Sequence, residues 1–333
     1  MTQPAFSIRP FREGDEHGVL ALFNEVFELG NPDFVPRTLD QWNWQFRDNP
    51  EGHHTHVAES EGRIVGQYTA VPTRWRMPHG LHHGAQALDT CVATEFRRSL
   101  KKTGLFLSLG REWFDFYGCP ERDVIVYGFP NPQAFRIGTK RLDYRPVHCP
   151  VPEWSLPVAA ACEWSQGGVS VQEFQRFGDD VGALDEALGE GFSNVRDARA
   201  LNWRYADNPN HDYLLLRAEG SDGSLRGMMV ATLGWHGDRQ DIAPMVDWLV
   251  PEGDLATWRA LLGELGRRGR EAGLEFLLAW APPWHGHAHD LQSLGFQQTE
   301  SRFNLCIRVF SDEFTVEDAK RRWYVLMGDS DIY

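Results

Sequence analysis

The sequence has no long hydrophobic run, since no apolar stretch reaches the ~18–20 residues that a membrane-spanning helix needs. The first residues, MTQPAFSIRP, contain no basic segment followed by an apolar one, so we expect no secretion signal. Cysteine is also scarce: the five cysteines are odd in number and never form a CxxC pair. We therefore expect no disulfide framework, and we predict a cytoplasmic protein with reduced thiols and no membrane partner.

Basic residues are fewer than acidic ones, 33 against 47, which gives a net charge of −14. Such a chain is a poor general binder of nucleic acid, so we expect no nucleic-acid partner. The charge is uneven, because residues 1–150 hold 17 Lys and Arg against 18 Asp and Glu. An anionic small ligand is therefore expected in the first half of the chain.

The motif WHGHAHD contains three histidines at alternate positions, His285, His287 and His289. In an extended segment their side chains would lie on one face and could bind a metal ion together. The preceding Pro-Pro pair and the glycine within the motif favour a polar loop instead. We expect no metal site.

One eight-residue string occurs twice: NWQFRDNP at residues 43–50 returns as NWRYADNP at residues 202–209, an offset of 159. An aspartate in an apolar strand follows each copy, Asp89 in ALDTCV and Asp247 in PMVDWLV. These aspartates lie 41 and 40 residues after the aspartate of the DNP motif. Chance recurrence of Asn-Pro at turns does not keep such spacing. The sequence therefore predicts a duplicated domain.

Hydrophobic periodicity predicts the same series of elements in both halves. The first half has a short strand in FSIRPF, an amphipathic helix, a hairpin, a buried strand over 85–93, a helix over 101–117 and the strand VIVYGF. We expect FNLCIRV, near the end of the chain, to complete the second sheet. The predicted fold class is α+β (mixed α/β), with a central, mostly antiparallel sheet in each domain. The expected domains are 1–148 and 167–333, joined by a linker over 149–166.

A basic turn follows the predicted strand at residue 93, in the sequence EFRRSLKKTGLF. Its four cations, Arg97, Arg98, Lys101 and Lys102, stand at the start of the next predicted helix. Cations there oppose the helix dipole unless an anion binds, and helix starts bind phosphates readily. The turn therefore predicts a pyrophosphate site, with an exposed basic helix start as the alternative.

This segment, with FSIRPFREGDEHGVLALFNEVF before it and VIVYGFPNPQAFRIGTKRLDYRPV after it, resembles the GCN5-related N-acetyltransferases (GNAT). The pattern (Gln/Arg)-x-x-Gly-x-(Gly/Ala) is matched best by residues 101–106, with Lys first and Phe106 last. The resemblance implies two tandem GNAT-like domains with splayed strands. The first would bind acetyl-CoA. The second would be degenerate, because its counterpart WLVPEGDLATWRALL lacks the basic cluster.

The resemblance also implies the cofactor contacts. Pantetheine pairs with an open strand edge, whose amides stabilise the oxyanion, and the pyrophosphate lies over the following turn. The expected acetyl-CoA contacts are Cys91, Val92, Ala93, Arg97, Arg98, Lys101, Lys102, Thr103, Gly104, Leu105 and Asn131.

Two residues are candidates for catalysis. Asp89 is a candidate general base, and its alternative role is to hold a neighbouring loop at a strand end. Many relatives place a tyrosine in the last helix as the acid, but Thr139 aligns there in this chain. Tyr127 is the candidate substitute, with packing in the core as its alternative role.

The expected function is transfer of an acyl group, acetyl by resemblance, from acyl-CoA to a small amine by direct attack in a ternary complex. Two alternatives stay open: a catalytically silent protein that binds CoA or serves as a scaffold, and an aminoacyl-tRNA-dependent transferase. A homodimer also stays open.

Overall fold

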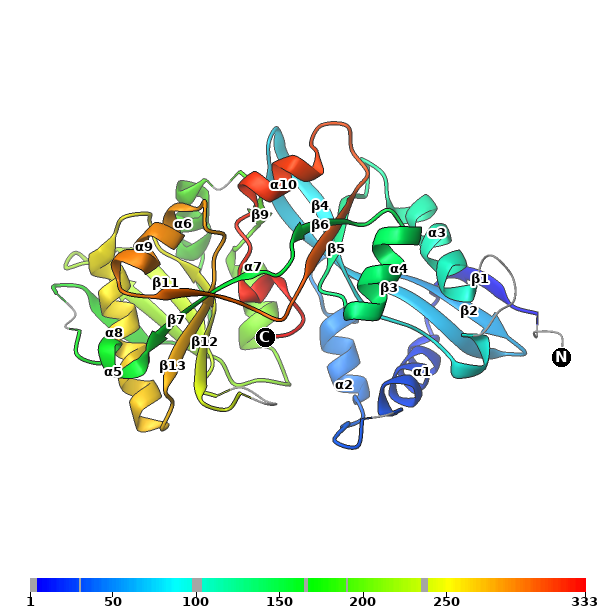
Figure 1. The fold of residues 1–333 in the computed structure, drawn as a ribbon, viewed down its shortest axis with the longest axis horizontal. Helices are drawn as coiled ribbons and strands as arrows, with labels where there is room; N and C mark the ends of the chain where they lie inside the picture. The colour runs from blue at the N-terminus through cyan, green and yellow to red at the C-terminus, as the bar shows by residue number, and fades with distance from the viewer. Residues whose placement is uncertain (1–4, 30, 98–103, 165–166, 190, 235–238) are drawn as a thin grey trace. The chain divides into compact units, whose positions relative to one another are not determined.

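The computed structural model describes residues 5–29, 31–97, 104–164, 167–189, 191–234 and 239–333. The chain forms two compact units, each discontinuous in sequence (Figure 1). The first unit contains residues 1–75, 80–147 and 305–316, and the second contains residues 76–79, 148–304 and 317–333. Each unit has one sheet flanked by helices, which confirms the predicted mixed α/β fold class.

The sheet of the first unit has the strand order β1-β2-β3-β4-β5-β15-β6. The pairs β1–β2, β2–β3 and β5–β15 are antiparallel, and β4–β5 is parallel. Its strands are β1 (Ser7–Pro10), β2 (His54–Ser60), β3 (Arg63–Met77), β4 (Gly80–Val92), β5 (Asp123–Gly128), β6 (Arg145–His148) and β15 (Leu305–Val309). Its helices are α1 (Glu16–Glu28), α2 (Leu39–Trp42), α3 (Leu105–Tyr117) and α4 (Pro132–Arg141), with the π turn η1 (Asn43–Arg47) and the 3-10 turn η2 (Thr94–Phe96).

The sheet of the second unit has the order β8-β10-β11-β12-β13-β7-β14. Its strands are β7 (Pro152–Pro157), β8 (Ser170–Glu173), β10 (Leu214–Glu219), β11 (Leu225–Ala231), β12 (Ile242–Leu249), β13 (Phe276–Trp280) and β14 (Gln297–Glu300). The two-residue strand β9 (Ser193–Asn194) is not part of this sheet. Its helices are α5 (Val158–Ala161), α6 (Asp180–Leu188), α7 (Ala198–Leu201), α8 (Leu255–Glu271), α9 (Gly286–Ser293) and α10 (Val316–Arg322), with the turns η3 (Asn202–Ala206) and η4 (Met327–Asp329). No helix in the described ranges has the length and hydropathy needed to cross a membrane.

The two sheets match strand for strand. Each has a parallel pair at the same place in the order, β4–β5 in the first and β12–β13 in the second. The duplication predicted from the repeat is thereby confirmed at the level of the fold.

One strand of each sheet comes from a distant part of the sequence. β15 lies between β5 and β6, and β7 lies between β13 and β14. The prediction that FNLCIRV completes the second sheet is therefore wrong, since it pairs with β5 of the first. Residues 149–166, expected as a linker, contain β7 and α5. An apolar run predicts a strand, but it does not specify which sheet edge the strand joins.

The repeated string forms the same corner twice. A capping residue begins a one-turn helix: Thr38 Oγ1 accepts from the Gln41 amide at 3.3 Å, and Asp197 Oδ1 accepts from the Ala200 amide at 2.9 Å. A π turn follows in each unit, η1 and η3. The aromatic ring on each turn is buried, Phe46 at 1% and Tyr205 at 3% exposure. The repeat is therefore a structural corner.

A glycine on the third strand of each sheet lets a helix approach closely. A Cβ on Gly66 would lie 2.8 Å from Leu109 Cδ1 of α3, and one on Gly227 would lie 2.8 Å from Thr257 Cγ2 of α8. Because a larger residue would push the helix away, these glycines fix α3 and α8 against their sheets.

Candidate functional site

In the first unit β4 and β5 part beyond their paired segment, and this splayed end of the two strands is where the predicted site residues begin. Their parallel register runs from His83 to Gln86 on β4, but β4 continues to Val92. Asp89 lies in this continuation with a φ of 52°, in the left-handed region that aspartate tolerates better than most residues. A residue in this conformation disrupts the regular ladder as a bulge does. The strands are thus splayed, and one edge of β4 is left open beyond Gln86.

The backbone of β4 presents one amide of the predicted trio to this edge. The Ala93 amide donates to the Val65 carbonyl of β3 at 2.9 Å, so it points toward β3. Because successive residues of a strand direct their polar groups to opposite edges, the amide of Val92 is directed to the β5 side of β4. The Val92 carbonyl, on the same edge, accepts from Nε of Arg97 at 2.9 Å. Among Cys91, Val92 and Ala93, only Val92 therefore has its amide directed to the β5 side of β4, and its contact with a cofactor stays a prediction.

Cys91 has no nucleophilic role in this geometry. Its side chain is buried, and burial raises the pKa of its thiol well above the usual range. The thiol therefore stays protonated, while only the thiolate is a strong nucleophile.

The carboxylate of Asp89 is held by an arginine. Arg37, just before α2, forms an ion pair with it through both terminal nitrogens, the longer contact being 3.4 Å from Nη2 to Oδ1. The Asp89 side chain is 8% exposed, and its carbonyl accepts from Gln67 Nε2 at 2.8 Å. This arrangement fits the alternative role given to Asp89, that of joining a neighbouring segment to β4.

Tyr127 lies in the core. Its side chain is 1% exposed, and its ring packs edge-on against Trp75 at 5.5 Å. Thr139, the position aligned with the acid of relatives, donates its hydroxyl to the Phe135 carbonyl at 2.8 Å within α4. Neither side chain is presented as a proton donor in this structure.

Asn131 caps α4. Its Oδ1 accepts from the amides of Gln133 and Ala134 at 3.1 and 2.9 Å, which leaves the Nδ2 hydrogens facing outward as donors. The predicted cofactor contact through Asn131 therefore has one group available to make it.

The start of α3 has no side-chain cap among the residues that the structure describes. Gly104 is its N-cap, with no side-chain cap and no acidic residue in the first turn. Leu105, the first helical residue, is buried. Four residues of the predicted pyrophosphate turn, Arg98, Lys101, Lys102 and Thr103, lie outside the described residues. The part of the turn that is described is thus compatible with an anion at the helix start.

The corresponding helix of the second unit is closed by its own carboxylates. Asp254 caps α8, accepting from the Thr257 amide at 3.1 Å, and Arg226 donates to it at 2.7 Å. The Gly253 amide donates to both oxygens of Asp290, the shorter contact being 3.0 Å. An anionic ligand would meet two carboxylates here, so this end of the second unit does not resemble a phosphate site.

The Arg–Asp pair, however, occurs in both units. Arg196 donates from Nε to Asp247 Oδ1 at 2.7 Å, and Arg196 lies 159 residues after Arg37 in the sequence. Our sequence interpretation missed Arg37, although this shared offset within the repeat was the available signal. The pair occurs in the unit without the basic turn as well, which favours a structural role for Asp89.

The histidine motif of the second unit lies mostly in its core. His285 and His287 are 4% and 1% exposed, and Nε2 of His287 lies 2.7 Å from the Val250 carbonyl. No group of three or more His, Cys, Asp or Glu side chains within the described ranges could hold a metal ion.

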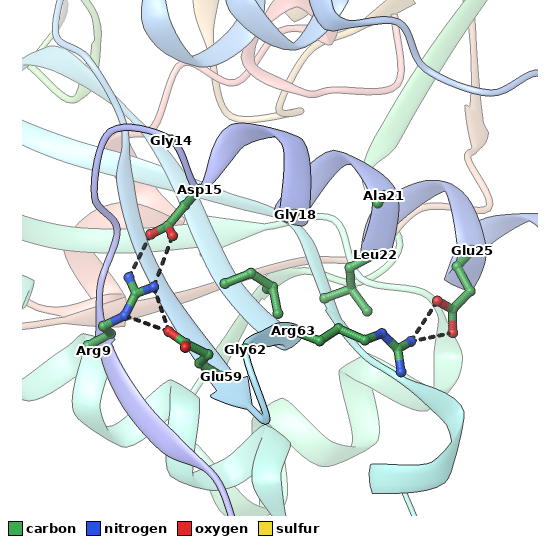
Figure 2. A pocket seen from close by; sticks show the side chains of 11 residues that line it. Arg9, Gly14, Asp15, Gly18, Ala21, Leu22, Glu25, Glu59, Gly62 and Arg63 are labelled. Atoms are coloured by element: carbon green, nitrogen blue, oxygen red, sulfur yellow. Dashed lines mark hydrogen bonds and ion pairs between the residues drawn. The ribbon is translucent and has the colours of Figure 1, made fainter.

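A separate cavity of about 470 Å³ lies in the first unit between α1 and the β2–β3 turn (Figure 2). Arg9 donates to Asp15 and Glu59 at 2.6 and 2.8 Å, and Arg63 donates to Glu25 at 2.7 Å. The charged side chains in its wall are thus paired with one another, and none of the predicted site residues lies there.

Comparisons with known proteins agree with this architecture. A sequence-family model described as an acetyltransferase (GNAT) domain matches residues 7–117. No curated protein sequence is significantly similar to the chain.

Solved structures match over most of the chain at low identity. A probable N-acyltransferase from Enterococcus faecalis V583 has a TM-score of 0.66 and 10% identity, over 92% of this chain and 72% of that one. A tandem GNAT protein from the clavulanic acid biosynthesis pathway has a TM-score of 0.53 and 14% identity, over 93% and 100%. Saccharomyces cerevisiae N-myristoyltransferase with bound myristoyl-CoA has a TM-score of 0.57 and 11% identity, over 93% and 85%.

Residues 7–117 thus belong to the acetyltransferase (GNAT) domain family, and the chain as a whole has the fold of a tandem GNAT protein.

Proposed function

We propose that the first unit transfers an acyl group from an acyl-CoA, with acetyl-CoA as the donor, to the nitrogen of a small amine. One observation carries the proposal: α3 begins at Gly104 with no side-chain cap among the described residues, whereas Asp254 and Asp290 occupy the corresponding turn of the second unit. An open helix start suits the pyrophosphate of CoA. The five cysteines are free in the structure, in keeping with the reducing cytoplasm that we propose as its location.

In the proposed reaction a neutral amine attacks the thioester carbonyl carbon. The new C–N bond forms, the C–S bond breaks, and the amine proton leaves to solvent as the CoA thiolate is released. The Val92 amide is the backbone group placed to donate to the oxyanion, a contact that strengthens as charge develops on oxygen. Asp89 would have to leave Arg37 to accept the proton, so orientation of the amine and oxyanion stabilisation would carry the rate.

The second unit, in this proposal, binds no acyl-CoA. Residues 151–333 hold most of the negative charge of the chain, and the turn before α8 contributes Glu252, Asp254 and, from α9, Asp290. Carboxylates at this turn repel a pyrophosphate. The second unit would instead have a structural role in the chain.

Binding and turnover test the proposal. Acetyl-CoA should raise the melting temperature of the full chain, and a panel of small amines should then elicit thiol release from it. A folded sample that neither binds acetyl-CoA nor releases thiol contradicts the proposal.

The ion-paired Asp89 and the buried Tyr127 favour one second candidate, a protein that binds CoA without turnover. Binding of acetyl-CoA without thiol release, across the whole amine panel, would establish that candidate in place of the enzyme.

Charge reversal locates the binding turn. The double variant Lys101→Glu with Lys102→Glu should lose acetyl-CoA binding and keep the melting temperature of the unliganded protein. A matched control, Arg111→Glu with Arg259→Glu, makes the same charge change at exposed positions on α3 and α8. Equal affinity of the two double variants would refute the pyrophosphate assignment.

A further inference from the structure

The last eleven residues of the chain, the final segment (residues 323–333), form part of the second unit's interior. Tyr324 and Leu326 belong to the hydrophobic core of the second unit, which also includes residues of α8, β12 and β13. The side chains of residues 323–327 are 0–2% exposed. The segment is thus enclosed rather than laid on the surface.

The final segment bridges the two strands that part in the second unit. A Cβ on Gly328 would lie 2.9 Å from Asp247 Oδ2 and 3.2 Å from the Val246 carbonyl, both on β12. The ring of Tyr333 lies 5.3 Å from the ring of Trp280, the last residue of β13. The segment therefore extends from one strand to the other.

This location corresponds to the splayed end of β4 and β5 in the first unit. The parallel pairing of β12 with β13 runs from Ile242 to Pro244, and Asp247 follows three residues later. In the first unit the pairing ends at Gln86, and Asp89 follows three residues later. The final segment therefore lies in the second unit at the position that corresponds to the splayed end of β4 and β5 in the first.

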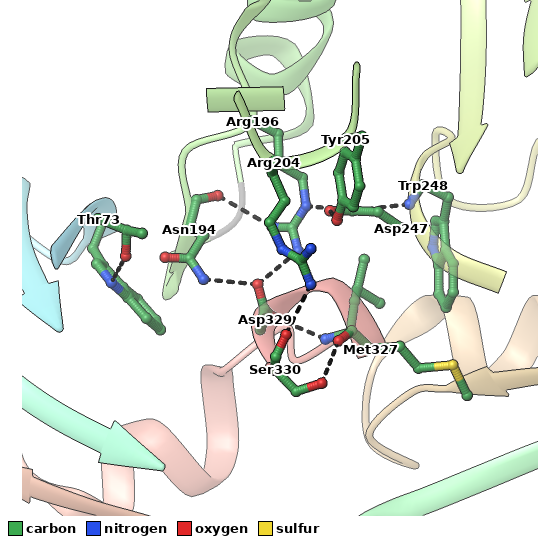
Figure 3. A network of polar contacts seen from close by, with 12 residues as sticks. Thr73, Asn194, Arg196, Arg204, Tyr205, Asp247, Trp248, Met327, Asp329 and Ser330 are labelled. Atoms are coloured by element: carbon green, nitrogen blue, oxygen red, sulfur yellow. Dashed lines mark hydrogen bonds and ion pairs between the residues drawn. The ribbon is translucent and has the colours of Figure 1, made fainter. Parts of the chain in front are cut away.

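The segment is recognised by polar groups as well as by packing (Figure 3). Asp329 Oδ1 accepts from Asn194 Nδ2 at 2.7 Å and from Arg196 Nη2 at 3.0 Å. Arg204 donates from Nη2 to the carbonyl of Ser330 at 2.9 Å and also to that of Tyr333. Buried Arg196 and half-buried Arg204 thus contact one carboxylate and two backbone oxygens of the segment, as a binding site contacts a peptide.

The size of the side chain at position 328 is restricted as well. A Cβ on Gly328 would lie 2.0 Å from the hydroxyl of Tyr205, which itself donates to Asp247 at 2.7 Å. Only glycine fits at this position while that hydrogen bond is kept.

From these contacts we propose that the cleft between β12 and β13 is a binding site for an acidic peptide with the sequence Gly-Asp-Ser, and that residues 323–333 occupy it in cis. The arginines and Asn194 recognise the aspartate and the following carbonyls, and Tyr205 excludes side chains at the glycine. This proposal is independent of acyl transfer by the first unit.

Hydrogen exchange of the full chain tests whether the segment is a separable ligand. Asp329→Asn keeps the shape of the side chain but loses the charge that meets Arg196. We expect the amides of residues 324–332 to exchange about tenfold faster, while those of α8 keep their protection. The control Asp312→Asn, at an exposed position, should leave both unchanged. Unaltered exchange of the segment, or equal acceleration in α8, would overturn the proposal.

Binding in trans is the second test. A fluorescein-labelled peptide of residues 323–333 should bind the full-chain Gly328→Ala variant, and the same peptide with Asp329→Asn should bind about tenfold more weakly. Wild-type protein should bind neither, because the tethered segment is present at high effective concentration. If Gly328→Ala does not fold, the Asp329→Asn protein is the host. Equal binding of the two peptides, or none by a folded host, would refute the site.

Discussion

The Arg37–Asp89 ion pair offers the sharpest test of how the first unit is built. The perturbation is Asp89→Asn. Asparagine tolerates the left-handed φ of 52° about as well as aspartate, so the backbone keeps its conformation and only the charge is lost. Arg37 then loses the carboxylate that it contacts through two nitrogens.

The expected cost lies between two limits. Removing one partner of a buried ion pair lowers the free energy of unfolding by about 3–5 kcal/mol. Removing one partner of a surface ion pair lowers it by about 0–1 kcal/mol. The side chains of Arg37 and Asp89 are 20% and 8% exposed, so we expect a loss of about 2 kcal/mol in the free energy of unfolding. Arg196 and Asp247 are only 3% and 5% exposed, and Tyr205 also bonds Asp247, so Asp247→Asn should cost about 4 kcal/mol.

Urea unfolding followed by circular dichroism and by tryptophan fluorescence measures both losses, since two units need not unfold together. A double-mutant cycle with Arg37→Gln isolates the pair, with an expected coupling energy of about 1–2 kcal/mol. Acyl-transfer assays give a separate readout. If Asp89 acts through Arg37, both single variants should slow turnover alike and leave the shape of the pH profile unchanged.

Two results would refute this reasoning. A coupling energy near zero would show that the ion pair does not hold β4. Loss of the acidic limb of the pH profile in Asp89→Asn alone, with Arg37→Gln unaffected, would identify Asp89 as the general base instead.

Two further predictions concern stability. Gly266→Ala should destabilise the second unit by about 2 kcal/mol although alanine favours helices, because the new Cβ would lie 2.7 Å from the Cys162 amide nitrogen. In the control Gly182→Ala the nearest atom to the new Cβ is at 3.6 Å, so this variant should stabilise by about 0.5 kcal/mol. The urea midpoints of the two variants check both values, and equal shifts would contradict the packing argument. Burial lowers the pKa of His56 to about 4, below the ~6.5 of an unfolded histidine. The buried neutral ring therefore makes its full contribution to the free energy of unfolding above pH ~6.5. That contribution is lost as the pH falls toward 4, which lowers the free energy of unfolding by an amount on the order of 3 kcal/mol. The unfolding free energy of His56→Phe should therefore depend less on pH over this range, and an unchanged slope would exclude His56 as the cause.

The acyl-CoA turn remains a prediction from the sequence. Its basic residues could be found because charge opposed to a helix dipole is visible within a few residues of sequence. The described neighbours, Arg97 and Gly104, are compatible with it, and the charge-reversal variants provide the test.

The sequence by itself determined the elements and their repetition. The period of 159 residues is visible by comparing the two halves of the sequence, and the amphipathic helices and buried strands are predicted from hydrophobic patterns within short windows. α3 at Leu105–Tyr117 and β4 at Gly80–Val92 overlap the helix expected over 101–117 and the strand expected over 85–93.

Only the tertiary structure decided which distant groups meet. It paired β15 with β5, joined Arg37 to Asp89, enclosed Tyr127 and placed the final segment between β12 and β13. An apolar strand can add to any compatible sheet edge, and an aspartate can pair with any arginine within reach, so composition and periodicity leave these choices open. They are made by the long-range packing of the whole unit, where burial makes one combination lower in free energy than the others.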